Sequence, residues 1–139
     1  MPEITNDPST WPSGDRMWDF CRAIAQHEGA AEAGSAPDRF NNPGDLSKGD
    51  EHGQEVSGYH RLPDGENLII FSTKAGGWMA LQAKFQNILD GKSHVYSPAM
   101  SLTEIGSKYA SDPAWAKGVA EIFGVDPGQP FESYFNTSG

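Results

Sequence analysis

The stretch GDRMWDFCRAIAQHEG, residues 14–29, decides how the rest of the chain is interpreted. Apolar residues recur along it at helical spacing, on one face that holds Met17, Phe20 or Cys21, and Ile24. The stretch therefore predicts an amphipathic helix, which begins near Ser13 or Asp15 and ends at His27 or Glu28. One carboxylate, that of Glu28, stands where this helix gives way to a loop.

The segment that follows, residues 29–55, is small, polar and turn-rich. Gly29 is a natural C-terminal stop for the helix. The stretch NNPGD, residues 41–45, has strong turn chemistry. Loops of this length inside a compact domain are usually functional or disordered, so a functional site is expected where the helix meets this loop.

The rest of the chain predicts a hairpin and further helices. GYHRL, residues 58–62, and ENLIIF, residues 66–71, flank the turn Pro63-Asp64-Gly65. More helical segments follow: Ser72 or Thr73 through Asp90, the capping box of Ser101 and Glu104 to about Ala110, Asp112-Pro113 to Gly124, and a short last turn from Phe131 to Phe135. This order predicts a mostly helical α+β fold with a small antiparallel hairpin, and a cleft between hairpin and helices as a plausible ligand site. We expect residues 1–12 to be a loose arm and residues 13–139 to form one domain.

Composition and charge exclude several classes of function. The net charge is −9, from 10 basic and 19 acidic residues, so binding to nucleic acid through phosphate neutralisation is not expected. No signal peptide is visible and no apolar run is long enough to span a membrane. Cys21 is the only cysteine, so an intramolecular disulfide is excluded and the compartment stays open.

Glu28 is placed as an acid catalyst of glycosidic bond cleavage would be. Such an acid must keep its proton near neutral pH, so its pKa must rise from about 4.3 toward roughly 6. Glu28 shares a helical face with Trp18, Cys21 and Ala25, and burial against apolar groups raises a carboxyl pKa. The partial negative charge of a helix C-terminus acts in the same direction. On spacing alone, the alternative is an ordinary surface carboxylate.

Several short motifs in order resemble one family. AIAQHEG, residues 23–29, followed by FNNPGDLSKGD, residues 40–50, resembles a pattern in peptidoglycan-cleaving glycosidases of the lysozyme superfamily. The pattern is similar to that of bacterial N-acetylglucosaminidase autolysins and of goose-type lysozymes with lytic transglycosylases, including phage-associated members. FSTKAGGWMAL, residues 71–81, resembles the strand-to-helix step of the family, and YASDPAW, residues 109–115, resembles the Tyr-Ala-Thr-Asp-Pro stretch of the autolysins. Together the matches run from about residue 23 to residue 123.

The resemblance implies a lysozyme-like domain that cleaves β-1,4 bonds between N-acetylated sugars of peptidoglycan, as a muramidase, a glucosaminidase or a lytic transglycosylase. By position, Glu28 matches the general acid, Asn41 and Asn42 match the turn that lines the cleft, and Tyr109 matches a tyrosine near the reacting sugar. Tyr59, on the hairpin, is a further candidate for substrate binding, because its ring can stack on a sugar and its hydroxyl can form hydrogen bonds.

Two departures from the family pattern leave the subfamily and the bond open. Gly29 follows the acid, where the better-known branches have Ser. Pro-Gly-Asp-Leu, residues 43–46, stands where the autolysin turn carries Phe-Gly-Ile.

A second carboxylate would decide the mechanism. Inversion needs a base at about 6.5–9.5 Å from the acid, and double displacement needs a nucleophile at about 5–5.5 Å. Asp45 is the best candidate because it lies on the turn, although it could equally be a turn residue that binds its own backbone. Its competitors are Glu32, Asp50, Glu51, Glu55 and Asp64. With no such carboxylate, the N-acetyl group of the substrate would assist, and the product would be an anhydro-sugar.

Three rival hypotheses remain. The first is a non-catalytic glycan-binding or phage structural module with the same fold. The second is a zinc amidase, but the four histidines lack ligand spacing and no HExxH is present, so we expect neither metal nor cofactor. The third is a cysteine peptidase, but Cys21 falls inside a helix, away from the N-terminus that would stabilise a thiolate. Peptidoglycan glycan strands are the expected partner, and an inhibitor or immunity protein is not identified by the sequence.

Overall fold

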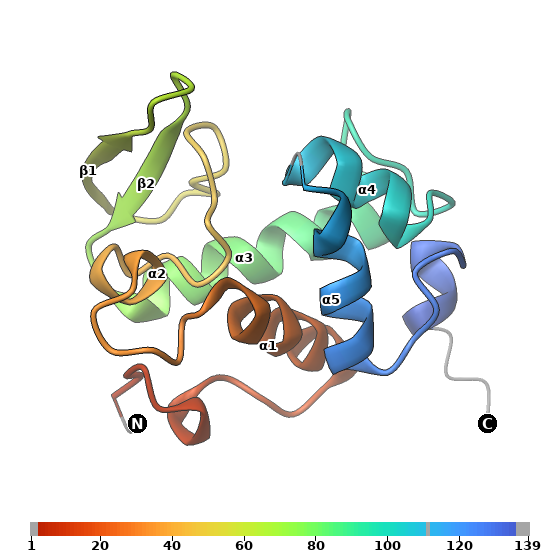
Figure 1. The fold of residues 1–139 in the computed structure, drawn as a ribbon, viewed down its shortest axis with the longest axis horizontal. Helices are drawn as coiled ribbons and strands as arrows, with labels where there is room; N and C mark the ends of the chain where they lie inside the picture. Colours follow the sequence, from red (N-terminus) through yellow and green to blue (C-terminus); the bar gives the residue numbers. More distant parts are fainter. Residues whose placement is uncertain (1–2, 111, 136–139) are drawn as a thin grey trace. The chain divides into compact units, whose positions relative to one another are not determined.

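The computed structural model describes residues 3–110 and 112–135. In chain order its elements are η1 (Pro8–Thr10), α1 (Arg16–Glu28), α2 (Ala36–Arg39), β1 (Val56–Arg61), β2 (Asn67–Phe71), α3 (Lys74–Leu89), α4 (Leu102–Tyr109), α5 (Pro113–Phe123) and η2 (Phe131–Phe135). Helices with one antiparallel two-stranded sheet make this a mostly helical α+β fold, so the predicted fold class is confirmed (Figure 1). No helix among the described residues is long and apolar enough to cross a membrane.

The internal contacts divide the chain into two compact units, Met1–Lys84 and Phe85–Gly139. The first unit contains α1, α2, the hairpin and most of α3. The second contains the end of α3 together with α4, α5 and η2.

Helix α1 forms as its sequence predicts. The side chain of Asp15 accepts a hydrogen bond from the Trp18 backbone N–H at 2.8 Å, which caps the first turn. Gly29 ends the helix with φ 88°, a left-handed conformation that costs glycine little. The apolar stripe is buried and comprises Met17, Phe20, Cys21, Ala23, Ile24 and Ala25. Glu28, the last residue of the helix, is half-buried.

Strand β2 has main-chain partners on both of its edges. On one edge it pairs with β1, with Tyr59 opposite Ile69. On the other edge, the loop between α2 and β1 runs beside it: the Phe71 N–H donates to the Phe40 carbonyl at 2.9 Å, the Ile69 N–H to the Leu46 carbonyl at 3.0 Å, and the Lys48 N–H to the Asn67 carbonyl at 2.8 Å. The loop between α2 and β1 is therefore held to the sheet by backbone hydrogen bonds, although it contains no strand.

Two features of the first unit differ from expectation. The loop contains a short helix, α2, which Ser35 caps by accepting from the Asp38 N–H. The segment expected to be a loose arm is anchored: Trp11 is only 5% exposed and its ring lies 5.1 Å from that of Trp78. Asn6 also donates to the Ala31 carbonyl at 3.0 Å. Packing of the Trp11 ring against Trp78 removes apolar surface from water, and this explains why the described residues 3–12 are held in place.

The second unit is built on helix caps and an aromatic core. The predicted capping box is present, since Ser101 accepts from the Glu104 N–H and the Glu104 carboxylate accepts from the Ser101 N–H. Helices α4 and α5 approach closely at Gly106, where a β-carbon would lie 2.9 Å from the Trp115 ring. The ring of Tyr109 lies 4.8 Å from that of Trp115 and 5.6 Å from that of Phe85.

Candidate functional site

The first unit brings together the two carboxyl groups that the sequence singled out. Glu28 stands at the C-terminal end of α1, and Asp45 lies on the turn that follows α2. Their side chains are joined by a hydrogen bond, although they are far apart in the sequence. Both residues are half-buried, so each carboxyl group is partly removed from water.

The pKa of Asp45 is raised above its ordinary value, chiefly because burial disfavours the charged form. The hydrogen bond with Glu28 opposes this and lowers the pKa of Asp45, and the negative charge of Glu66 raises it. The net effect is a raised pKa, so the surroundings of Asp45 favour its neutral form although the hydrogen bond with Glu28 acts against this.

The direct hydrogen bond also restricts what Asp45 can do. Carboxyl groups in hydrogen-bond contact are closer together than the roughly 5–5.5 Å of a nucleophile or the 6.5–9.5 Å of a base that holds water. This arrangement does not favour Asp45 as a nucleophile or base. A carboxylate this close to an acid instead shares its proton, as paired carboxyls do.

Asn42 is not available to a substrate, which corrects its assignment as a substrate contact. It is 1% exposed, and both ends of its amide are used inside the protein. Its Nδ2 donates to the carbonyls of Leu46 and Ile69, each at 2.9 Å, and its Oδ1 accepts from the Leu46 N–H at 2.8 Å. A buried amide must satisfy its polar atoms, and here the backbone of the turn and of β2 does so.

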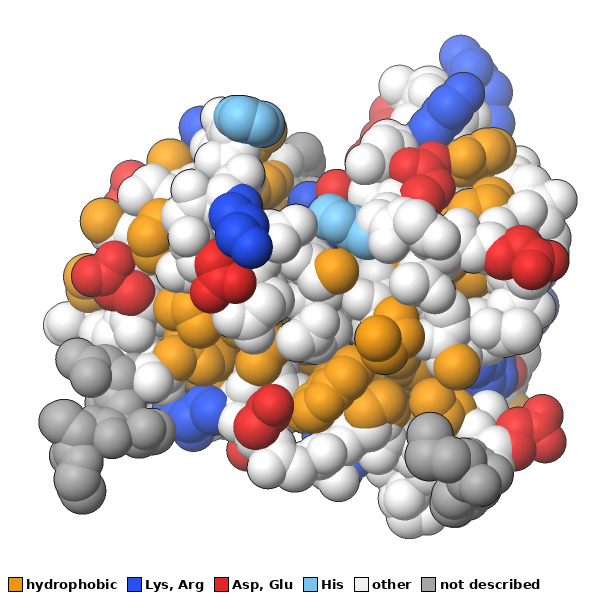
Figure 2. Space-filling view, turned by 180° about the vertical axis from the view of Figure 1, so that it is seen from behind, with side chains coloured by type: hydrophobic (Ala, Val, Ile, Leu, Met, Phe, Trp, Pro, Cys, Tyr) orange, Lys and Arg blue, Asp and Glu red, His pale blue; other side chains and the backbone are white. Residues whose placement is uncertain are grey.

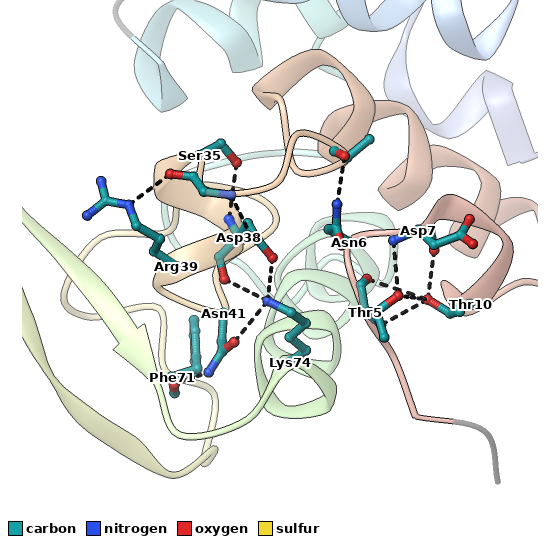
Figure 3. Close-up of polar contacts among 12 residues, drawn as sticks. Thr5, Asn6, Asp7, Thr10, Ser35, Asp38, Arg39, Asn41, Phe71 and Lys74 are labelled. Carbon is teal, nitrogen blue, oxygen red and sulfur yellow. Dashed lines mark hydrogen bonds and ion pairs between the residues drawn. The ribbon is translucent and has the colours of Figure 1, made fainter.

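Asn41 is likewise used for structure. Figure 3 shows its side chain between Phe71 and Lys74: Nδ2 donates to the Phe71 carbonyl at 2.9 Å, and Oδ1 accepts from Lys74 Nζ at 3.1 Å. Lys74 also forms an ion pair with Asp38 at 2.8 Å, which ties α2 to the start of α3. The Lys74 ammonium, as a hydrogen-bond donor, is the main reason that the pKa of Asp38 is lowered.

Helix α3 closes the turn from the other side. A β-carbon built on Gly77 would lie 1.8 Å from the carbonyl oxygen of Asn41 and 3.0 Å from Pro43 Cδ. Only a glycine allows the helix to come this close to the turn. The turn that carries Asp45 is thus enclosed between β2 and α3.

The two tyrosines predicted to bind substrate differ in their surroundings. Tyr59 on β1 is 40% exposed, its hydroxyl donates to Glu51 at 2.6 Å, and Lys48 Nζ lies 5.3 Å from its ring centre. Its exposed ring is suited to stacking on a sugar. Tyr109 lies in the second unit, half-buried beside Trp115.

Glu66, the residue just before β2, is a residue that sequence reasoning missed. It is exposed, and its Oε1 accepts a hydrogen bond from the hydroxyl of Ser47, two residues after Asp45. Its charge acts on Asp45, as the raised pKa of that residue records. No sequence signal identified Glu66, because its closeness to Asp45 depends on the fastening of the loop to β2.

The competing carboxylates have other roles or surroundings. Asp50 pairs with Lys84 at 2.8 Å, Glu51 accepts from Tyr59, and Asp64 accepts from the Glu66 N–H at 2.9 Å. The other two, Glu32 and Glu55, are exposed. On the face in Figure 2, acidic side chains lie in several separate places.

The described residues contain no cluster of three or more His, Cys, Asp or Glu side chains that could hold a metal ion. Cys21 is fully buried, and burial raises the pKa of its thiol far above the usual range. Such a thiol is a poor nucleophile. Comparisons of the chain with protein-family models, with curated proteins and with solved structures found no match.

Proposed function

We propose that this protein cleaves the glycan strands of peptidoglycan at β-1,4 bonds between N-acetylated sugars, with Glu28 as the general acid. The observation that carries the proposal is the hydrogen bond that pairs Glu28, at the end of α1, with the half-buried Asp45. General-acid cleavage of a glycosidic bond needs a carboxyl group that keeps its proton, and a neighbouring carboxylate favours that state by like-charge repulsion.

In this proposal, the glycosidic oxygen takes the place of Asp45 as the acceptor of the Glu28 proton. The C–O bond breaks as the proton is transferred, and the leaving sugar departs as an alcohol. Glu28 is then a carboxylate beside Asp45, and repulsion between the two favours taking up a new proton from solvent. Asp45 therefore favours the reprotonation of Glu28.

Completion of the reaction needs a second group, and Glu66 is the candidate because its charge acts on Asp45. It is exposed and accepts a hydrogen bond from the Ser47 hydroxyl, so water can reach its carboxyl group. The other route uses the N-acetyl group of the substrate as the internal nucleophile. The two routes give different products, a reducing end by hydrolysis and an anhydro-sugar by internal attack.

Substrate grip in this proposal comes from hydrogen bonds and from the exposed ring of Tyr59. A net charge of −9 gives no long-range attraction to an anionic cell wall. Added salt should therefore not weaken binding, because it screens a repulsion rather than an attraction.

The test is mass spectrometry of soluble fragments after purified peptidoglycan is incubated with the wild type and with Glu28→Gln. We expect fragments from the wild type and none from the variant. Reducing or anhydro-muramyl ends then identify the route. If the folded wild type binds peptidoglycan and releases nothing, the proposal is overturned in favour of a glycan-binding module.

A further inference from the structure

Asn42 is the only polar or charged residue fully buried among those that the structure describes. Burying an amide without hydrogen-bond partners costs free energy. Here the amide is satisfied by three hydrogen bonds of 2.8–2.9 Å. The groups that form these hydrogen bonds indicate the role of the Asn42 side chain.

The partners of Asn42 surround Asp45. The Asn42 carbonyl accepts from the Asp45 N–H at 3.2 Å, and the Asn42 side chain both donates to and accepts from the backbone of Leu46, the next residue. The second donated bond reaches Ile69 on β2. One side chain thus bridges the turn internally and adds a second link to β2, beside the backbone bond from the Ile69 N–H to the Leu46 carbonyl.

The backbone of Asp45 needs such support. Its φ is 53°, in the left-handed region that residues with a β-carbon seldom adopt. A conformation of this kind persists where the surroundings determine it, and it gathers at functional sites. The contact between Gly77 and Asn41 limits movement of the turn toward α3. Without the Asn42 amide, the turn would keep this barrier and its backbone bonds to β2, but it would lose the side-chain bonds to Leu46 and Ile69.

We infer that Asn42 is a positioning residue, whose buried amide holds the Asp45 carboxylate in hydrogen-bond contact with Glu28. A role of this residue in catalysis rests on the proposed function, but the contact between Asp45 and Glu28 can be measured without any substrate. Asn42 touches neither the reacting bond nor the proton, and it acts only through the turn.

The experiment is a carboxyl ¹³C NMR titration of Glu28 and Asp45 in the wild type and in Asn42→Ala. Two carboxyls that share a proton titrate as a pair, so each signal reports both midpoints. We expect two-step curves for both residues in the wild type, and a single step for each in Asn42→Ala. The matched control is Asn41→Gly, which removes a neighbouring amide at a residue with φ 54°, where glycine is unstrained. The control should keep the two-step curves.

Two-step curves that persist in folded Asn42→Ala would overturn the inference and leave the role of Glu28 intact. Single-step curves in the wild type would overturn both, because the pair itself would be absent. If Asn42→Ala does not fold, hydrogen exchange in the wild type decides. The Leu46 amide, which donates to Asn42 Oδ1, should be protected as strongly as the Ile69 amide. Exchange at the rate of an unprotected amide would contradict the inference.

Discussion

A β-carbon on Gly77 would lie 1.8 Å from the carbonyl oxygen of Asn41, which is far inside van der Waals contact. The first turns of α3 therefore pass directly against the backbone of the turn that leads to Asp45. The neighbouring Gly76 differs, because its β-carbon would lie 3.2 Å from the Thr73 hydroxyl and no closer to anything else.

These two glycines give a matched pair of substitutions. Gly77→Ala must displace backbone, so we expect a loss of roughly 3 kcal/mol or more in the free energy of unfolding, at or above the upper end for overpacking. Gly76→Ala should cost well under half as much, since a hydroxyl can shift and alanine favours a helix. Urea unfolding of both variants measures the difference. Equal stability of the two would contradict the close approach.

The buried tryptophan of the N-terminal segment should contribute to stability. Trp11→Ala removes the contact with Trp78 and the cation–π contact with Arg22, whose guanidinium lies 6.0 Å from the ring. We expect a loss of about 3–5 kcal/mol, as for other buried aromatic truncations. Met79→Ala, at a residue that is 48% exposed, is the control and should change stability by less than about 0.5 kcal/mol. A Trp11→Ala protein as stable as the control would mean that the segment is loose after all.

The raised pKa of Asp45 predicts how its replacement depends on pH. A carboxyl whose pKa is higher in the folded than in the unfolded state favours folding when protonated, and this contribution is lost as pH rises from the unfolded pKa through the folded one. Asp45→Asn cannot ionise and escapes that loss. Its stability relative to the wild type should therefore increase between about pH 4 and pH 7, the range that begins at an ordinary Asp pKa. Unfolding by urea across this range measures the trend, and a relative stability that falls with pH would refute the account of Asp45.

The thiol of Cys21 should be inert in the folded protein. It is fully buried and its pKa is raised by burial, so almost no thiolate is present at pH 8. A thiol-reactive chromogenic disulfide should label the denatured protein within minutes and leave the native protein unlabelled over the same time. Rapid labelling of the native protein would reopen the question of a nucleophilic cysteine.

Sequence reasoning succeeded where the determinants are local. The Asp15 cap, the apolar stripe of α1 and the Gly29 stop lie within one stretch, so the helix and the place of Glu28 at its end could be predicted. The capping box at Ser101 was predictable for the same reason.

The errors concern contacts between distant segments. Asn42 stands in a sequence that is typical of a turn facing a cleft. Its hydrogen bond to the Ile69 carbonyl, however, depends on how the loop lies along β2. The link from Ser47 to Glu66 has the same origin, and so does the burial of Trp11 against Trp78. Spacing along the chain carries no information on which segments meet, and these residues were therefore assigned wrongly or missed.

The central claim is that Glu28 supplies the proton that cleaves the glycan. The most direct test is the initial rate of fragment release from purified peptidoglycan by Glu28→Gln and by Glu32→Gln, a control at an exposed carboxylate on the adjoining loop. The account predicts a loss of about 10²-fold to 10⁴-fold for Glu28→Gln, the usual contribution of general-acid catalysis, and a wild-type rate for Glu32→Gln. Equal rates for the wild type and Glu28→Gln would contradict it.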